Sequence, residues 1–551
     1  MSIVTPRELI AFLIGQNCLG QNRAVMWLLG SGLMFRGAIA YLLPPGFDEA
    51  YYFLYTQHLS WSYFDHPLAV ALSTGIGVWL TGVVSPFTIR LGALGLFTGS
   101  LWLLYETGKV LFGARAGWLG CAIASLSPLF FLTFGTLTAP DNALMFFWSA
   151  TLYLCAHEFF PSNAFLDSSR PYQPTPRLAL VGLTVGLACL SKYHGGLLGL
   201  GLVGFCIASP LYHRALYSRW MGLSIALFSL CLLPILHWNS QHDWISLRFQ
   251  LGIGGSASAV SRFATDSAGY SFTNLLGVFL AEIGFLFPTL GLPLWWVSIG
   301  AWTKAPRGKL TSCMQQAKIQ LVLWSGLPAA VGFTFIGGLT HTYPAWPAPG
   351  LWSLTLLLGY AAAGWPRRTV WRWLQGTGLA IGVIIVFALG HITLGTLQKP
   401  GQYAFFGGFI TPQQDPSTAL IDVRQLRGRL AHSDEFWAAI ATTDFILTHE
   451  FWLGGYVAMA LPESVHLPVA SFTQDPRGQA FWFDAKDWLG KDALFVSLAD
   501  FEQKQVIEAI APYFQSIRPL SPVTIQRGST TTETFYLYKA DTLIKPYKYP
   551  Y

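Results

Sequence analysis

Apolar runs of about membrane-spanning length recur along most of this chain, and they limit the folds open to it. A helix needs roughly 20 predominantly apolar residues to cross the hydrocarbon core of a bilayer. Since 53% of the 551 residues are hydrophobic and only 11% are charged, the sequence predicts a mainly α-helical, polytopic membrane protein of about eleven transmembrane helices. The eleven runs are 24–43, 88–108, 116–136, 140–157, 178–193, 196–212, 220–238, 272–300, 319–338, 350–364 and 374–396.

A twelfth run, 68–84, is nearly as long but carries Ser73, Gly77 and Thr81 at intervals of four residues. On a helix these three residues form one small and polar stripe. We therefore expect this segment to be an interfacial helix that does not cross the membrane.

The distribution of Lys and Arg fixes the predicted topology. With a cytoplasmic N-terminus and eleven crossings, the outer loops carry only Lys192, Arg248 and Arg262. This asymmetry is what the positive-inside rule requires, and a crossing by 68–84 would invert every later loop. The inner segments carry Arg7, Arg23, Lys109, Arg115, Arg170, Arg177, Arg214, Arg219, Lys304, Arg307, Lys309, Lys318, Arg367, Arg368 and Arg372.

The final segment, 397–551, differs in composition from the rest. Its charge is higher, its apolar runs are shorter, and four strand-like pieces (FILTHEF, DALFVSL, VTIQRG and TFYLYKA) accompany the helix-like piece DFEQKQVIEAIAPYF. We expect a multi-helix membrane domain over 1–396 and a small α/β or α+β domain over 397–551, outside the membrane after eleven crossings.

The outer loop 44–87, after the first predicted crossing, is the strongest candidate for chemistry. Its first part, 44–67, holds the carboxylates Asp48, Glu49 and Asp65 but no Lys or Arg. The positive charge that balances them must come from elsewhere. Ionisable groups within or beside the hydrocarbon are costly and usually functional, so the outward-facing set predicts one reaction centre at the outer face. Further members of that set are His66, Arg90, Asp141, Lys192, Arg248 and His341.

Several short motifs recur here in a specific order and loop placement. They are FDEAYYFLYTQHLSWSYFDHPL, Arg90-Leu-Gly, LTAPDNALMFFW, GLACLSKYHGG, HWNSQHDW and HTYPAWPAP. Over about residues 20–400 this set resembles the C-type membrane glycosyltransferases, and in particular the glycosyltransferase family 39 branch that contains protein O-mannosyltransferases and lipid A aminoarabinose transferase. The resemblance implies the GT-C fold. It also implies transfer of a sugar from a polyprenyl-phosphate donor, with inversion at the anomeric carbon and without a nucleotide donor.

The resemblance also implies roles for the acids. Asp48 matches the acid expected to bind or deprotonate the acceptor, and such a base must hydrogen-bond the attacking group. The alternative is that Asp48 caps a helix that begins near Glu49, and the two roles are compatible. Glu49 is a weaker catalytic candidate. Asp141 is another, although it could be a plain N-cap of the run 140–157.

The departing lipid phosphate needs positive charge near it. Arg90 and Lys192 match basic residues of the relatives, and Arg248 is a third possibility. Arg suits a bidentate phosphate contact and Lys a point contact. The alternative for Arg90 and Lys192 is that they reach lipid headgroups.

Asp65-His66-Pro67-Leu68 stands where relatives have His-Pro-Pro or Lys-Pro-Pro, so the second proline is missing. Asp65 and His66 are expected to contact the substrate, with loop packing as the alternative. His341 together with Asp65, His66 or His242 has the residue types for a divalent cation, but no two have ligand spacing. We expect no cofactor and no metal, with a divalent cation as the alternative.

These features favour an enzyme of the bacterial inner membrane with a periplasmic C-terminal domain. It would transfer a hexosyl or pentosyl group to an envelope acceptor: a glycolipid such as lipid A, a polysaccharide or a glycoprotein. The alternatives are a transporter or flippase of a lipid-linked or small solute, which more often shows paired halves, and an oligosaccharide polymerase or ligase. The sequence has no basic stripe of the kind that predicts a nucleic-acid partner.

Overall fold

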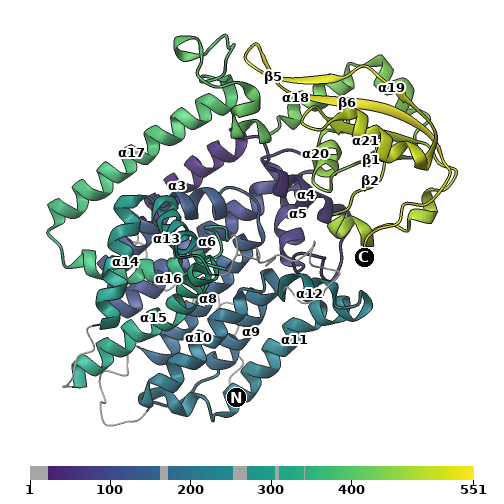
Figure 1. The fold of residues 1–551 in the computed structure, drawn as a ribbon. Helices are drawn as coiled ribbons and strands as arrows, with labels where there is room; N and C mark the ends of the chain where they lie inside the picture. Colours follow the sequence, from purple (N-terminus) through teal and green to yellow (C-terminus); the bar gives the residue numbers. More distant parts are fainter. Residues whose placement is uncertain (1–22, 162–171, 252–269, 304–309, 340–341) are drawn as a thin grey trace.

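The protein consists of a bundle of helices and a smaller C-terminal unit built around a β-sheet (Figure 1). The computed structural model describes residues 23–161, 172–251, 270–303, 310–339 and 342–551. In Figure 1 the bundle runs from purple to green, and the C-terminal unit, green to yellow, lies at one end of it.

Each of the predicted apolar runs coincides with helix. The run 272–300 is two helices bent by 117°, because Phe287 adopts φ +79° and Pro288 has no N–H with which to continue a helix. The bundle helices are α3 (Arg23–Leu42), α6 (Leu91–Phe112), α7 (Ala114–Leu126), α8 (Pro140–Phe159), α9 (Arg177–Ser191), α10 (Gly195–Ala208), α11 (Arg219–Gln241), α13 (Phe272–Leu286), α14 (Pro288–Thr303), α15 (Leu310–Ile336), α16 (Ala348–Ala363) and α17 (Arg367–Leu394).

Helix length supports fewer crossings than the apolar runs predict. Among the described residues, five helices are long and apolar enough to cross a membrane, and the bent α13–α14 pair makes a sixth if it counts as one span. α9, α10 and α16 are apolar but shorter. The protein is an integral membrane protein of mainly helical fold, and the number of eleven crossings stays a prediction.

Reciprocal hydrogen bonds join α8 and α16 inside the bundle. Trp148 Nε1 donates to Ser353 Oγ at 2.8 Å, and Trp352 Nε1 donates to Ser149 Oγ at 2.9 Å. A buried indole N–H needs an acceptor, so the pair fixes the two helices against each other. It thereby helps to position the start of α8, where Asp141 lies.

The C-terminal unit is a mixed sheet with helices, which confirms the predicted small domain. Strand order is β2-β1-β3-β6-β4, with β5 also paired to β6. β1 is parallel to β2 and β3, and β6 is antiparallel to its neighbours. The four predicted strand pieces are β1, β3, β5 and β6, and the predicted helix is α21. The elements are α18 (Val423–Ala431), α19 (Asp434–Ile440), β1 (Phe445–Thr448), α20 (Leu453–Ala460), β2 (Val469–Ser471), β3 (Ala493–Leu498), α21 (Gln503–Ile510), β4 (Phe514–Pro519), β5 (Val523–Arg527) and β6 (Thr530–Leu543).

The segment 44–87, predicted to be an outer loop, contributes two helices, α4 (Phe47–Gln57) and α5 (Ala69–Thr81). α4 shares one hydrophobic core with the C-terminal unit. Gly455 of α20 lies so close to α4 that a Cβ there would be 2.0 Å from the carbonyl oxygen of Ala50. This close approach needs glycine, and it joins the outer loop and the C-terminal unit into one packing unit.

Two of the three residues of the small stripe on α5, Ser73 and Gly77, pack against protein, while Thr81 is exposed. Ser73 and Gly77 are buried, and a Cβ on Gly77 would be 2.1 Å from the carbonyl oxygen of Thr88. Leu72 and Leu80 are the exposed side chains, at 46% and 79%. Most of the stripe is therefore a contact with protein, and the expectation that the segment is interfacial and does not cross the membrane stays a prediction. Small residues at this spacing let helices approach closely, and here they seat α5 against the segment that begins α6.

Candidate active site

Glu49 and Arg90 form a buried ion pair that fixes the start of α4. Arg90 Nε donates to Glu49 Oε1 at 2.8 Å, and Arg90 Nη2 donates to Glu49 Oε2 at 2.6 Å. Their side chains are 4% and 0% exposed, respectively. The carboxylate also accepts from the backbone N–H groups of Thr138 at 2.9 Å and Gly46 at 3.0 Å. A buried charge is tolerated when it is paired and hydrogen-bonded in this way.

The structure gives Arg90 a different role from the predicted phosphate contact. Besides Glu49, its guanidinium donates to the carbonyl oxygens of Ala40, Leu43 and Pro44 at 2.9, 2.6 and 3.0 Å. A guanidinium has five N–H donors, and all of them are engaged. Arg90 therefore clamps the end of α3 to α4 and has no donor left for a ligand. Glu49, which accepts four hydrogen bonds, is equally unsuited to act as a base.

Asp48 is the second residue of α4, and its side chain is exposed. Gly46 occupies the N-cap position, so the capping alternative for Asp48 is not realised. The N-terminus of a helix favours a negative charge, so the position suits a carboxylate. Asp48 is thus an accessible carboxylate on a backbone that its neighbour Glu49 holds in place.

Asp141 and Lys192 form a second buried pair. Lys192 Nζ lies 2.8 Å from both carboxylate oxygens of Asp141, and each side chain is 6% exposed. Asp141 follows Pro140 in the first turn of α8, whose N-cap is Ala139, and Lys192 follows the last residue of α9. The turn before α8 also donates a backbone N–H to Glu49, so it links the two ion pairs. Asp141 holds Lys192, and the plain N-cap interpretation does not apply.

Asp65 is almost completely buried, at 1% exposure. Its carboxylate accepts hydrogen bonds from the hydroxyls of Tyr55 and Tyr51. Its other carboxylate oxygen lies 3.4 Å from Nη1 of Arg477, a residue of the C-terminal unit. His66 is also buried, and its ring lies edge-on to the ring of Tyr52.

Two further predicted site residues, Arg248 and His341, remain. Arg248 lies on α12 (Ile245–Leu251) with an exposed side chain. His341 lies outside the described residues. Within the ranges that the structure covers, no group of three or more His, Cys, Asp or Glu side chains could hold a metal ion.

Two apolar cavities share Trp295 and Val331: one of about 420 Å³ lies between α13, α14 and α15, and one of about 480 Å³ lies between α14 and α15. At the same end of α15, the ring of Phe333 contacts the ring of His194 with centroids 4.5 Å apart. His194 is two residues from Lys192.

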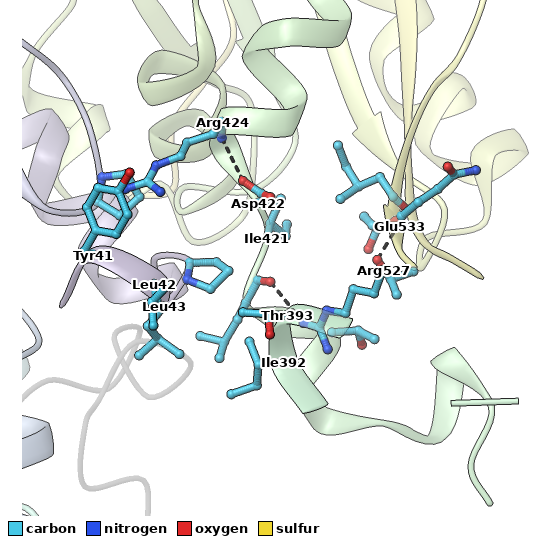
Figure 2. A pocket seen from close by; sticks show the side chains of 17 residues that line it. Tyr41, Leu42, Leu43, Ile392, Thr393, Ile421, Asp422, Arg424, Arg527 and Glu533 are labelled. Carbon is cyan, nitrogen blue, oxygen red and sulfur yellow. Dashed lines mark hydrogen bonds between the residues drawn. The ribbon is translucent and has the colours of Figure 1, made fainter. Parts of the chain in front are cut away.

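A smaller polar pocket lies where the ends of α3 and α17 meet the C-terminal unit (Figure 2). Arg424, Arg527 and Glu533 line it, and the Arg424 guanidinium lies 4.5 Å from the ring centroid of Tyr41. Its volume of about 110 Å³ holds only a few water molecules, at about 30 Å³ each. We do not place a lipid-linked sugar there.

Sequence reasoning missed two residues. Arg477 has no local signal, since nothing in its own segment marks it as the partner of an acid in the outer loop. Glu282 has a local signal, because it is a lone acid within the predicted run 272–300. An ionisable residue inside a membrane segment is by default a functional candidate. Glu282 is fully buried and accepts a hydrogen bond from the hydroxyl of Thr334 at 2.6 Å.

Comparisons with known proteins agree with this architecture. Residues 65–238 match the family model described as dolichyl-phosphate-mannose-protein mannosyltransferase. Crystal structures of ArnT from Cupriavidus metallidurans superimpose over nearly the whole chain. The complex with undecaprenyl phosphate has a TM-score of 0.56 at 16% identity, covering 94% of this chain and 98% of ArnT. The apo state gives 0.58 at 15% identity, covering 93% and 98%.

The protein has the GT-C glycosyltransferase fold. The sequence comparison points the same way: lipid A galacturonosyltransferase RgtD from Rhizobium johnstonii is 25% identical over 334 residues, or 58% of this chain. The match spans 61% of the length of RgtD. The GT-C fold and the predicted resemblance are thus confirmed, while the residue roles within the fold stay proposals.

Proposed function

We propose that this protein is an inverting glycosyltransferase that moves a sugar from a polyprenyl-phosphate donor to an envelope glycolipid at the outer face of the membrane. The observation that carries the proposal is Asp48, an exposed carboxylate on a helix start that the buried Glu49–Arg90 pair holds. The family model and RgtD both describe sugar transferases, and we do not carry the transporter alternative further. RgtD acts on lipid A and ArnT was crystallised with undecaprenyl phosphate, which supports these classes of acceptor and donor.

In this mechanism the Asp48 carboxylate accepts the proton of an acceptor hydroxyl as its oxygen attacks the anomeric carbon. The bond between that carbon and the phosphate oxygen breaks, and polyprenyl phosphate leaves with the electron pair. Attack from the face opposite the phosphate inverts the anomeric configuration. Glu49 and Arg90 take no part in proton transfer, because their hydrogen-bonding capacity is used within the protein.

Lys192 is our choice for the cation that meets the departing phosphate, with Asp141 as the residue that orients it. A buried ammonium in a site of low polarity stabilises developing negative charge more strongly than one in water. Arg248 is exposed and could contact the same phosphate from α12. The apolar cavities beside α14 and α15 have the surface chemistry that the isoprenoid chain of the donor requires.

The test is transfer by purified protein in lipid nanodiscs, with radiolabelled undecaprenyl-phosphate sugars supplied in turn and lipid A as acceptor. Asp48→Asn keeps the shape of the side chain but cannot accept the proton, so turnover should fall roughly 10²- to 10⁴-fold while donor binding is retained. Gln57→Ala, at the exposed far end of α4, is the matched control and should transfer normally.

Several outcomes would contradict the proposal. Near-normal transfer by Asp48→Asn would exclude Asp48 as the base. Movement of donor across the membrane without release of undecaprenyl phosphate would favour a flippase. Labelled polysaccharide or protein, with unlabelled lipid A, would replace the acceptor class.

A further inference from the structure

We propose that the C-terminal unit is a working part of the active site, because the ion pair between Arg477 and Asp65 positions α4 and the Asp48 that it carries. The catalytic consequence rests on the proposed function. Asp65 and Arg477 are then positioning residues, and Asp65 is not the substrate ligand that the sequence suggests.

Asp65 joins three parts of the protein. Its carboxylate accepts from Tyr55 and Tyr51, which face it from α4. Its backbone carbonyl oxygen accepts from Gln250 Nε2 of α12 at 2.6 Å, and its second carboxylate oxygen pairs with Arg477. At 1% exposure and with both carboxylate oxygens engaged, Asp65 has no access to a substrate. Its contacts are those of a structural residue that holds α4, α12 and the C-terminal unit together.

Two consecutive residues of the C-terminal unit contact Asp65 and the neighbouring side chain of α4. Arg477 supplies the charge, and the backbone N–H of the next residue, Gly478, donates to the hydroxyl of Tyr51 at 2.9 Å. Arg477 is itself held firmly. Its Nε lies 3.2 Å from Asp475, and its guanidinium lies 4.3 Å from the ring centroid of Phe451. It also adopts φ +46°, an unfavourable value for a side-chain-bearing residue that surrounding contacts must hold.

Arg477 supplies part of the positive charge that the segment 44–67 lacks. The segment 44–67 has three carboxylates and no cation of its own. Arg90 neutralises Glu49 from inside the bundle, and Arg477 neutralises Asp65 from the C-terminal unit. Burial alone would lower the pKa of Arg477, but the carboxylates of Asp65 and Asp475 raise it above its usual value. Arg477 therefore stays charged at any working pH.

Variants of Arg477 and Asp65, alone and combined, test whether the two residues act through their charges. Arg477→Gln leaves the buried Asp65 carboxylate without its cation, and an uncompensated buried charge is strongly unfavourable. We expect α4 to shift and kcat to fall about 10²-fold, the cost of a misplacement of about 1 Å, with the KM for donor within about twofold. Arg477→Lys keeps the charge and should recover most of the loss. Adding Asp65→Asn to Arg477→Gln removes the stranded charge and should recover at least about tenfold.

A second readout does not depend on catalysis. Hydrogen–deuterium exchange of peptides covering 47–57 should speed up in Arg477→Gln and return toward wild type in the double variant. The matched control is Arg518→Gln. It removes an exposed ion pair with Asp541 in the same unit, and it should change neither exchange nor kcat.

Two results would overturn the proposal. If Arg477→Gln raises the donor KM with unchanged kcat, Arg477 is a ligand contact. If the double variant exchanges and turns over no better than Arg477→Gln, the two residues are not coupled through charge. A wild-type protein without transferase activity would refute the proposed function, while the exchange experiment would still decide whether Arg477 and Asp65 position α4.

Discussion

Replacing Arg90 tests whether this residue binds the donor phosphate or clamps α3 to α4. As a phosphate ligand, Arg90 would be needed for donor affinity and little else. As the clamp seen here, it would be needed for stability. Replacing it with Leu removes one partner of a buried ion pair, which costs about 3–5 kcal/mol. The carbonyl groups of Ala40, Leu43 and Pro44 also lose their donors, so we expect a loss of about 5 kcal/mol in the free energy of unfolding.

The bundle offers a matched control in Arg36. Its side chain is as buried as that of Arg90, at 1% exposure, but it donates only to Thr98 Oγ1, at 3.0 Å, and lies over the ring of Phe97. None of the ion pairs found in the described residues includes it. Because a buried charge without a carboxylate partner is itself costly, Arg36→Leu should change the free energy of unfolding by less than about 1 kcal/mol or stabilise the protein.

Equilibrium unfolding in mixed detergent micelles measures both variants against wild type, and binding of undecaprenyl phosphate is measured on the folded fraction. Arg90→Lys keeps the charge but not the fork, so it should lie between Leu and wild type in stability. The reasoning fails if Arg90→Leu unfolds like wild type yet loses donor affinity, because the phosphate contact predicted from the sequence would then be right.

Three further predictions concern topology and pH. Cysteines placed at the exposed positions Gln57 and Lys504 should react with an impermeant thiol reagent in intact cells, and labelling only after lysis would refute an outer location. Burial raises the pKa of Glu533 from 4.5 to about 7, so stability falls as pH rises through this range; Glu533→Gln should stabilise the protein at pH 8 by up to about 3 kcal/mol and hardly at pH 5. An equal effect at both pH values would contradict this. Burial against Trp482 lowers the pKa of His58 from 6.5 to about 4, so stability falls as pH drops from 6.5 to 4. His58→Phe should abolish that loss in thermal unfolding scans, and an unchanged acid sensitivity would exclude His58 as its source.

Patterns that depend on local periodicity were predictable. The apolar runs and the strand-like pieces of the C-terminal unit correspond to helices and strands in the structure. The protein contact along the stripe on α5 was not predicted, because small residues at intervals of four fit either a polar face or a close helix contact. Only the neighbour, Thr88 against Gly77, distinguishes the two.

Partnerships across long sequence separations were not predictable. The absence of Lys and Arg from 44–67 correctly indicates that the balancing charge comes from elsewhere, but it cannot say from where. Glu49 finds its partner 41 residues away and Asp65 finds its partner 412 residues away. The second distance reflects a fold in which the last part of the chain packs on one of the first helices. No spacing rule within a single sequence reports such a contact.

That packing has a consequence for how the protein is made. α4 emerges from the ribosome long before α20 and the strands of the C-terminal sheet, yet its apolar side shares one core with them as well as with α5. Until the last part of the chain has folded, the membrane helices can be inserted while α4 lacks these contacts and Asp65 lacks its cation. Under the proposed function, the transferase would become active only at the last step of its synthesis, and a chain that is stalled or cut before Arg477 would be inserted in the membrane but inactive.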